Sequence, residues 1–361
     1  MARHQRREAL REMTSYHSPQ VDVPVRLNTN ESPFPPPSDW VERLGRIASS
    51  IDWNRYPDRS ARALREAIGA RHGVPAEMVF VANGSNEVIQ TILLAHAGAG
   101  RTVATFEPTY QMYAQIARVT GADVVQGERR ADFALDAAEV ERVARRYEPA
   151  VTFLCNPNNP TGLVEPRENL QTMLEVSTGV VVADEAYAEF ADWSAADMVH
   201  DDSTLAGTRT FSKTLSMAAL RIGYVVAPTW LVSDLEVAVL PYHLDAFKQA
   251  ATLAALEYVD EMEERVAAIR SERARISAAM SAIGVHVWPS GANFVLFRPV
   301  ADSLPEAARQ VWSAMLDRGV LVRDCSSWDR LSGCLRVTVG TPAENDAFLS
   351  ALSESVTSLA G

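Results

Sequence analysis

Short valine-rich runs alternate with helical patterns between about residues 78 and 228. The runs are MVFVANG, RTVATFEP, AVTFLC, GVVVADEAY, GTRTFS and RIGYVVAP, and helical segments such as SNEVIQTILLAHAG and TYQMYAQIARVTG stand between them. A strand that is buried on both faces reads as a continuous apolar run, because helices cover both faces of its sheet. The alternation therefore predicts an α/β domain built on a buried sheet.

A second, smaller unit follows this domain. Residues 246–283 form a long helical pattern without an internal proline, which predicts a helix that links two domains. After it, helical patterns near 304–318 and 343–359 alternate with the apolar runs VHVWPSGANFVLFRP, VLVRDCS and CLRVTVGT, so a small α+β domain is expected. The proline-rich ESPFPPPSDW near the start indicates an extended arm. We predict three parts, an N-terminal arm (1–34), a large domain (35–245) and a small C-terminal domain (246–361).

The composition excludes several classes of function. The formal net charge of −12 argues against nucleic-acid binding, which needs a basic face. The three cysteines (Cys155, Cys325 and Cys334) and the seven histidines are scattered, so neither a disulfide framework nor a metal site is predicted. No apolar run approaches the ~20 residues that span a bilayer, and the basic N-terminal segment lacks the apolar core of a secretory signal. We expect a cytoplasmic protein without metal, nucleic acid or membrane partners.

Three segments at the predicted ends of strands carry polar side chains, and open α/β sheets bind ligands at this edge. In NGSNE, Ser85 and Asn86 stand at a helix N-terminus, where backbone N–H groups bind anions; a plain helix cap is the alternative. The string NPNNPTG predicts a rigid turn with a functional role, and a simple tight turn is its alternative. In VVVADEAYAEF a buried strand runs into Asp184, which either has a cationic partner or caps a helix.

One lysine, Lys213, lies among hydroxyl residues in TRTFSKTLSMAALRIGY, with Arg221 eight positions later. A lone lysine is usually a solvated surface charge. A lysine that forms a Schiff base needs an accessible neutral amine, so burial or neighbouring cations must lower its pKa. Pyridoxal phosphate needs such a lysine, an acid at its ring nitrogen, donors to its phenolic oxygen and an anion anchor. The segments above offer a candidate for each of these groups, and together they predict a pyridoxal-phosphate enzyme.

The strings NPNNPTG, DEAY, SK and LRIGY resemble the fold-type I pyridoxal-phosphate aminotransferases. The strings VPVRLNTNESPFPPP, NRYPD, ANGSNE, TRTFSK, LPYHL, ANFVLF and ENDAFL are similar to histidinol-phosphate aminotransferases, especially the actinobacterial type, over nearly the whole chain. The resemblance implies an aspartate-aminotransferase-like fold, with a mixed, mostly parallel sheet in the large domain, a smaller α+β C-terminal domain and an N-terminal arm. It also implies a homodimer with shared active sites.

The resemblance further implies an activity. The expected reaction passes the amino group of histidinol phosphate to 2-oxoglutarate in histidine biosynthesis, with pyridoxal 5'-phosphate as cofactor. Aromatic-amino-acid aminotransferases and decarboxylases of phosphorylated amino acids have similar sequences, so the amino donor stays open. Two segments depart from related sequences: SMAALR replaces a glycine-rich stretch, and CSSWDRLSG (325–333) is longer than usual beside the substrate arginines. A non-catalytic protein of this fold is the remaining alternative, against which the intact site residues argue.

The matching positions imply a role for each cofactor residue. Lys213 would form the Schiff base and then act as general acid and base, and Asp184 would pair with the pyridinium nitrogen. Asn159 and Tyr187 would hydrogen-bond the phenolic oxygen, and Tyr110 would stack on the ring. The residues implied to hold the phosphate are Ser85, Asn86, Thr210, Ser212 and Arg221.

Four further residues are implied to act at the edge of the site. Tyr56, in NRYPD, would reach the phosphate in the neighbouring subunit; an ordinary turn aromatic is the alternative. Arg336 would grip the acidic end of the substrate, and Arg323 is a second candidate for the same anion, unless it pairs with Asp324. Tyr16 matches a tyrosine near the substrate, on an arm that closes over the site.

Overall fold

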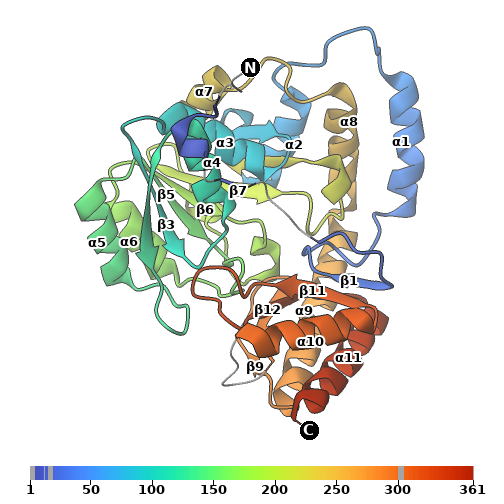
Figure 1. Cartoon of the computed structure of the whole chain (residues 1–361). Coiled ribbons are helices and arrows are strands. Elements are labelled where there is room, and N and C mark those ends of the chain that lie inside the picture. The colour runs from blue at the N-terminus through green and yellow to red at the C-terminus, as the bar shows by residue number, and fades with distance from the viewer. Residues whose placement is uncertain (1–4, 12, 15–18, 300–304, 361) are drawn as a thin grey trace.

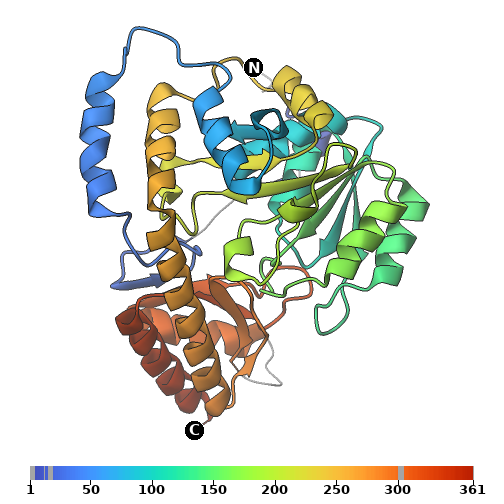
Figure 2. The same ribbon diagram turned by 180° about the vertical axis from the view of Figure 1, so that it is seen from behind.

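The structure is a computed structural model and describes residues 5–11, 13–14, 19–299 and 305–360. Two lobes of unequal size are visible in Figure 1, and the longest helix connects them in the reverse view of Figure 2. The larger lobe contains the alternating strands and helices of the first two thirds of the chain. The smaller lobe contains the C-terminal third together with a strand from the N-terminal arm.

The large lobe is built on a seven-stranded sheet with the order β2-β8-β7-β6-β5-β3-β4. Only β8 runs antiparallel to its neighbours, so the predicted mixed, mostly parallel sheet is confirmed. Its strands are β2 (Val79–Ala82), β3 (Thr102–Glu107), β4 (Asp123–Glu128), β5 (Val151–Cys155), β6 (Val180–Asp184), β7 (Leu205–Thr210) and β8 (Gly223–Val226).

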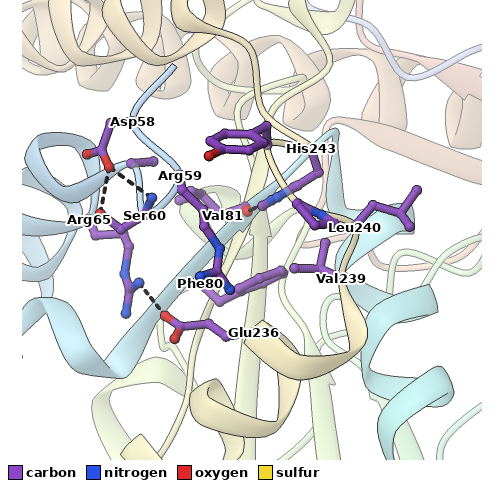
Figure 3. A pocket seen from close by; sticks show the side chains of 13 residues that line it. Asp58, Arg59, Ser60, Arg65, Phe80, Val81, Glu236, Val239, Leu240 and His243 are labelled. Carbon is purple, nitrogen blue, oxygen red and sulfur yellow. Dashed lines mark hydrogen bonds and ion pairs between the residues drawn. The ribbon is translucent and has the colours of Figure 1, made fainter. Parts of the chain in front are cut away.

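Helices pack on both faces of this sheet. They are α1 (Ser38–Ser50), α2 (Arg62–His72), α3 (Ser85–His96), α4 (Met112–Thr120), α5 (Ala137–Tyr147), α6 (Arg167–Val176), α7 (Thr229–Ala238) and α8 (Ala246–Ala255). Short 3₁₀ turns are η1 (Glu8–Leu10), η2 (Ala76–Met78), η3 (Ala188–Phe190), η4 (Ala196–Met198) and η5 (Ala218–Leu220). An ion pair of 2.6 Å between Arg65 of α2 and Glu236 of α7 joins helices from opposite faces (Figure 3).

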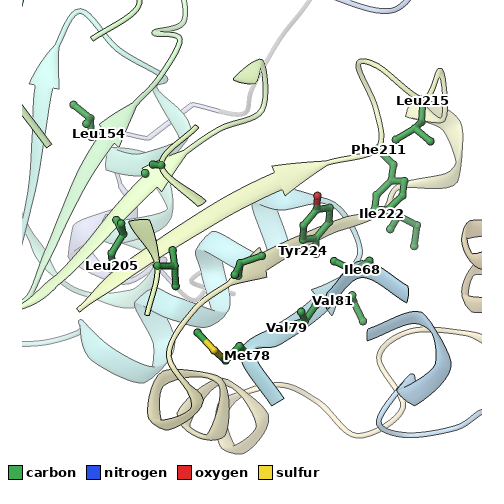
Figure 4. Packing of buried hydrophobic residues seen from close by; sticks show 14 of the residues in the cluster. Ile68, Met78, Val79, Val81, Leu154, Leu205, Phe211, Leu215, Ile222 and Tyr224 are labelled. Carbon is green, nitrogen blue, oxygen red and sulfur yellow. The ribbon is translucent and has the colours of Figure 1, made fainter. Parts of the chain in front are cut away.

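The strands are buried on both faces because their side chains alternate between two apolar clusters. In β6, Val180 and Val182 pack with α3, α4 and α7, whereas Val181 and Ala183 pack with α2, α5, α6 and α8. Figure 4 shows part of the second cluster, with Ile68 of α2 close to β2. Full burial of a valine stabilises the fold by roughly 2 kcal/mol, so a continuous apolar run is favourable only where helices cover both faces.

The predicted linking helix is interrupted. The structure divides it into α8, the 3₁₀ turn η6 (Leu256–Tyr258) and α9 (Val259–Ala282). The indole Nε1 of Trp40 in α1 donates to the carbonyl oxygen of Ala251 at 2.9 Å, so α8 is anchored to the large lobe. Helix α9 then continues into the small lobe, where Ile269, Ile276 and Met280 are buried.

The small lobe has a five-stranded sheet with the order β1-β11-β12-β10-β9. Its strands are β1 (Val25–Leu27), β9 (His286–Val287), β10 (Phe294–Arg298), β11 (Val320–Asp324) and β12 (Leu335–Thr338), and α9, α10 (Pro305–Asp317) and α11 (Pro342–Ala360) pack against it. The arm strand β1 pairs in parallel with β11, and this pairing fixes the chain that follows β1 beside the large lobe. None of the described helices is long and apolar enough to cross a membrane.

Candidate active site

A cavity of about 420 Å³ lies where the large lobe, the small lobe and the arm meet. The ends of β5, β6 and β7 form one side of it, and residues 29–31 of the arm and strands β11 and β12 form another. Most of the predicted site residues line this single cavity: Ser85, Asn86, Tyr110, Asn159, Asp184, Tyr187, Thr210, Ser212, Lys213, Arg221, Arg323 and Arg336.

Two predicted site residues are not brought to the cavity. Tyr56 is 81% exposed, and its ring stacks on Tyr242 at a centroid distance of 4.6 Å, outside the cavity lining. Its implied role concerns a second subunit and stays a prediction. Tyr16 lies outside the described residues.

Lys213 is held in the cavity by the arm. Its Nζ donates to the carbonyl oxygen of Thr29 at 3.2 Å and lies 5.8 Å from the centre of the Tyr187 ring. Burial, reinforced by the positive charges of Arg336 and Arg221, lowers the pKa of Lys213 to about 8, although Glu31 opposes the shift. A large fraction of neutral amine is therefore present slightly above neutral pH, as a nucleophilic lysine requires.

The last residue of β6, Asp184, and the acid that follows it, Glu185, point in opposite directions. Asp184 faces the cavity, whereas Glu185 is fully buried beside Arg209, with 3.2 Å between its Oε2 and the guanidinium. Glu185 also accepts a hydrogen bond from the hydroxyl of Ser194 at 3.0 Å. Because alternate residues of a strand face opposite sides of the sheet, only Asp184 can serve the cavity.

The carboxylate of Asp184 is held by Tyr113, a residue that the sequence analysis did not single out. The Tyr113 hydroxyl donates to Oδ2 at 2.6 Å, and the backbone N–H of Ala186 donates to Oδ1 at 3.0 Å. Burial raises the pKa of Asp184, and these two hydrogen bonds oppose that rise. Within the described residues Asp184 forms no ion pair, so a cationic ligand atom would stabilise its charged form.

The turn after β5 directs one of its three asparagines into the cavity. The side chain of Asn156 accepts from the N–H of Glu165 at 2.9 Å, and the side chain of Asn158 donates to the carbonyl oxygen of Pro108 at 3.0 Å. Both therefore hold the turn itself. Asn159 instead accepts from Nη1 of Arg336 at 2.5 Å and lines the cavity.

Tyr187 has a hydrogen-bonding partner from the arm. The Nδ2 of Asn30 donates to the Tyr187 hydroxyl at 3.0 Å, and both side chains are buried. Burial raises the pKa of Tyr187 further above its ordinary value, so the phenol keeps its proton. Because its oxygen already accepts from Asn30, the hydroxyl proton can be donated to a ligand in the cavity.

An anion cradle forms where α3 begins. Gly84 precedes the helix with φ 86°, and no side chain caps the helix start, so the alternative of a Ser or Asn cap is not observed. A Cβ at Gly84 would lie 2.8 Å from Nη2 of Arg221, so glycine lets this guanidinium approach the exposed N–H groups. Nη1 of Arg221 donates to the Ser212 hydroxyl at 3.3 Å, and the Thr210 hydroxyl lies 3.0 Å from the same oxygen.

Two arginines form the opposite wall. Arg323 of β11 and Arg336 of β12 are directly paired across the two strands, and both are more than nine-tenths buried. The Nη2 of Arg336 donates to the carbonyl oxygen of Asn28 at 3.2 Å, while its buried Nε has no partner among the described residues. The carboxylate of Asp324 accepts from the N–H of Ser326 and forms no ion pair with a described residue, so an Arg323–Asp324 pair is not observed.

The comparisons with known proteins agree with this arrangement. The sequence pattern of the aminotransferase class I and II family matches residues 22–352. The chain belongs to this family. The aminotransferase is 43% identical to the histidinol-phosphate aminotransferase of Frankia casuarinae, an alignment that covers 97% of this chain and 90% of that protein. It is 44% identical to the Streptomyces avermitilis protein of the same name, with 96% and 95% covered, and the predicted resemblance is confirmed.

Solved structures confirm the predicted fold of the aminotransferase. The histidinol-phosphate aminotransferase of Sinorhizobium meliloti, crystallised with pyridoxal-5'-phosphate, has a TM-score of 0.84 at 24% identity, with 93% of this chain and 92% of that chain covered. An aspartate aminotransferase variant from Thermus thermophilus has a TM-score of 0.80 at 23% identity, covering 97% and 99%. At these identities the likeness concerns the fold.

The cavity fits the pyridoxal phosphate on which the family depends. The cradle of Gly84 and Arg221 is suited to a phosphate, and the buried acid Asp184 has no ion-pair partner among the residues that the structure describes. Lys213 lies in the same cavity. No group of three or more His, Cys, Asp or Glu side chains in the described part of the chain could hold a metal ion.

The pKa of Lys213 predicts how cofactor attachment depends on pH. The protonated amine cannot attack, so the rate at which cofactor-free aminotransferase is reconstituted should rise with pH and level off above a pKa of about 8. Stopped-flow absorbance at several pH values measures this rate. The Arg336→Gln variant should move the profile to higher pH, because it removes a positive charge that lowers the pKa. A wild-type rate that still climbs beyond pH 9.5 would contradict the assignment.

The Tyr113 hydroxyl predicts a change in cofactor affinity. Tyr113→Phe removes a hydrogen bond to a buried carboxylate, so the pKa of Asp184 should rise and the Kd of pyridoxal phosphate should increase by about tenfold or more. Fluorescence titration of the cofactor-free protein measures the Kd. Tyr224→Phe is the matched control, since this buried tyrosine bonds His72 outside the cavity. Equal losses in both variants would refute a specific role for Tyr113.

Proposed function

We propose that this aminotransferase uses pyridoxal 5'-phosphate to transfer the amino group of histidinol phosphate to 2-oxoglutarate in histidine biosynthesis. The observation that carries the reaction class is the position of Lys213, whose low-pKa amine shares one cavity with Asp184, an acid that forms no ion pair with any described residue. The substrate is supported by the shared name of relatives that are about 40% identical over nearly the whole chain. The buried cysteines and the acidic composition fit the cytoplasmic location that we predict.

The residues of the cavity have complementary tasks. When bound, pyridoxal phosphate supplies an electron sink for bonds at the amino-bearing carbon. Asp184 would keep a proton on the ring nitrogen, and the cradle around Arg221 would hold the phosphate. The Tyr187 hydroxyl and the amide of Asn159 would donate to the phenolic oxygen, because their oxygen atoms already accept from Asn30 and Arg336. The amine of Lys213 would take the proton from the amino-bearing carbon of the substrate and then pass it to a carbon of the cofactor, so it would act first as a base and then as an acid.

The opposite wall would orient the substrate. Arg336 is anchored through Asn159 and the carbonyl oxygen of Asn28, and its buried Nε has no partner among the described groups. A buried donor without a partner is costly, so an anionic oxygen at this position would stabilise the site. A phosphate ester or a carboxylate could supply that oxygen. The cavity can therefore accept both the amino donor and the acceptor in turn.

A comparison of amino donors tests the proposed substrate. The kcat/KM for histidinol phosphate should exceed that for phenylalanine by at least tenfold, because only the former brings a phosphate to the two arginines. Lys213→Ala should lose about a thousandfold or more in turnover and the visible absorption of the bound cofactor. A higher kcat/KM for phenylalanine would favour an aromatic-amino-acid aminotransferase instead, and a colourless wild-type protein would refute both.

We also propose that two copies of the chain form a dimer with shared active sites. Large apolar side chains are exposed at Tyr56, Leu240 and Tyr242, which supports a contact surface. Leu240 and Tyr242 line a pocket of about 210 Å³, in whose wall the His243 ring forms a hydrogen bond with the carbonyl oxygen of Val81 (Figure 3). In a dimer that covers this surface, Tyr56 of one subunit would lie close to the anion cradle of the other subunit.

The dimer can be tested at an exposed position. Leu240→Asp should convert the dimer to monomers and weaken cofactor binding, because a charge would be buried in the contact. Light scattering after gel filtration measures the mass. Tyr147→Asp is the matched control, since Tyr147 is exposed at the end of α5, which lies at the left edge of the large lobe in Figure 1, away from α7 and α8 on either side of Leu240. A monomeric wild-type protein with full activity would refute the shared site.

A further inference from the structure

The two arginines of the substrate wall bring two positive charges together on the small-lobe side of the cavity. Arg323 and Arg336 are cross-strand partners in register, and their side chains are 8% and 5% exposed. Like charges placed directly opposite one another on two strands destabilise a sheet. Aromatic rings that lie against the two guanidinium groups offset part of this repulsion.

The Phe294 ring lies 5.1 Å from the Cζ of Arg336, whereas the indole of Trp328 contacts both guanidinium groups. The indole ring of Trp328 has its centre 5.3 Å from the Cζ of Arg323 and 6.0 Å from the Cζ of Arg336. The face of an indole attracts a cation, and this attraction strengthens where water is excluded. Trp328 carries no charge, so it holds the guanidinium groups without neutralising them. A carboxylate in this position would instead compete with a substrate anion.

Trp328 is fixed in place by the connection between β11 and β12. This connection is closed by backbone hydrogen bonds from Cys325 N–H to Cys334, from Trp328 N–H to Cys325 and from Leu331 N–H to Trp328. The side chains of Cys325, Leu331 and Cys334 are fully buried beneath it. Figure 1 shows the red-orange connection extending from the small lobe toward the large one. The indole thus forms a fixed wall of the cavity, and the residues around it form a compact turn.

We propose that Trp328 is a specificity-determining residue, whose indole holds the guanidinium groups of Arg323 and Arg336 side by side, in an arrangement that selects a phosphate ester over a group of lower charge. A phosphate monoester carries close to two negative charges and three terminal oxygens, whereas a carboxylate carries one charge and two oxygens. Two adjacent guanidinium groups match the phosphate better. The Nε of Arg336, which has no partner in the described part of the chain, offers a further donor. This inference rests on the proposed use of histidinol phosphate.

The ratio of two kcat/KM values tests the inference. Histidinol phosphate and histidinol differ only in the phosphate, so the ratio of their kcat/KM values measures how well the site uses that group. In Trp328→Leu the ratio should fall about tenfold, and in Trp328→Phe, which keeps an aromatic face, by no more than about threefold. Trp193→Leu is the matched control, because Trp193 also lies over an arginine, at 5.4 Å from Arg167, but outside the cavity.

A binding measurement provides a second readout. In the cofactor-loaded protein, inorganic phosphate should raise the Tm of the wild type and of Trp193→Leu, and this increase should be mostly lost in Trp328→Leu. Trp328→Met is a second non-aromatic variant, to be used if the leucine variant does not fold. An unchanged ratio, or equal losses for both donors, would overturn the inference. A wild type without activity on histidinol phosphate would refute the proposed function, whereas the phosphate-dependent Tm would still test Trp328.

Discussion

One guanidinium group joins the three parts of the chain that enclose the cavity. Arg336 extends from the small lobe, donates to Asn159 of the large lobe and donates to the carbonyl oxygen of Asn28 in the arm. Hydrogen bonds from a charged donor in a buried setting are stronger than neutral ones. The same positive charge contributes to the low pKa of Lys213. Assembly of the lobes and activation of the lysine therefore depend on the same side chain.

The sequence predicts the central strands well and the edge strands poorly. Strands such as β5 and β6 are buried throughout, so their apolar runs are unambiguous. Strand β4 lies at the sheet edge and reads DVVQGE with mostly exposed or half-buried residues, and it was missed because edge strands need few apolar residues. Strand β1 has only three residues, and its pairing with β11 depends on a partner at the other end of the chain.

In the candidate site, some residues can be found from sequence motifs, whereas the roles of others depend on contacts that only the tertiary structure shows. Lys213, Asp184 and Asn159 belong to strings that are specific enough to be found by resemblance. Tyr113 and Trp328 act through neighbours that are distant in sequence, so nothing in their own segments indicates their contacts. The resemblance selects Asp184 over Glu185, but the physical reason is visible only in the sheet, where Asp184 faces the cavity and Glu185 lies beside Arg209.

The pairing of β1 with β11 has a consequence for the order in which the chain folds. All strands of the large sheet lie between Val79 and Val226, so they can assemble while the ribosome is still adding the C-terminal third. The small sheet needs Val25 beside Val320, a contact between nearly opposite ends of the chain that must form late. The emerging polypeptide would carry a completed large-lobe sheet, with Lys213 beyond the end of β7, before the small sheet forms and the arm brings Thr29 and Asn30 into the cavity. The cavity therefore gains its full affinity for a ligand only after the C-terminal third has been made and the small sheet has formed.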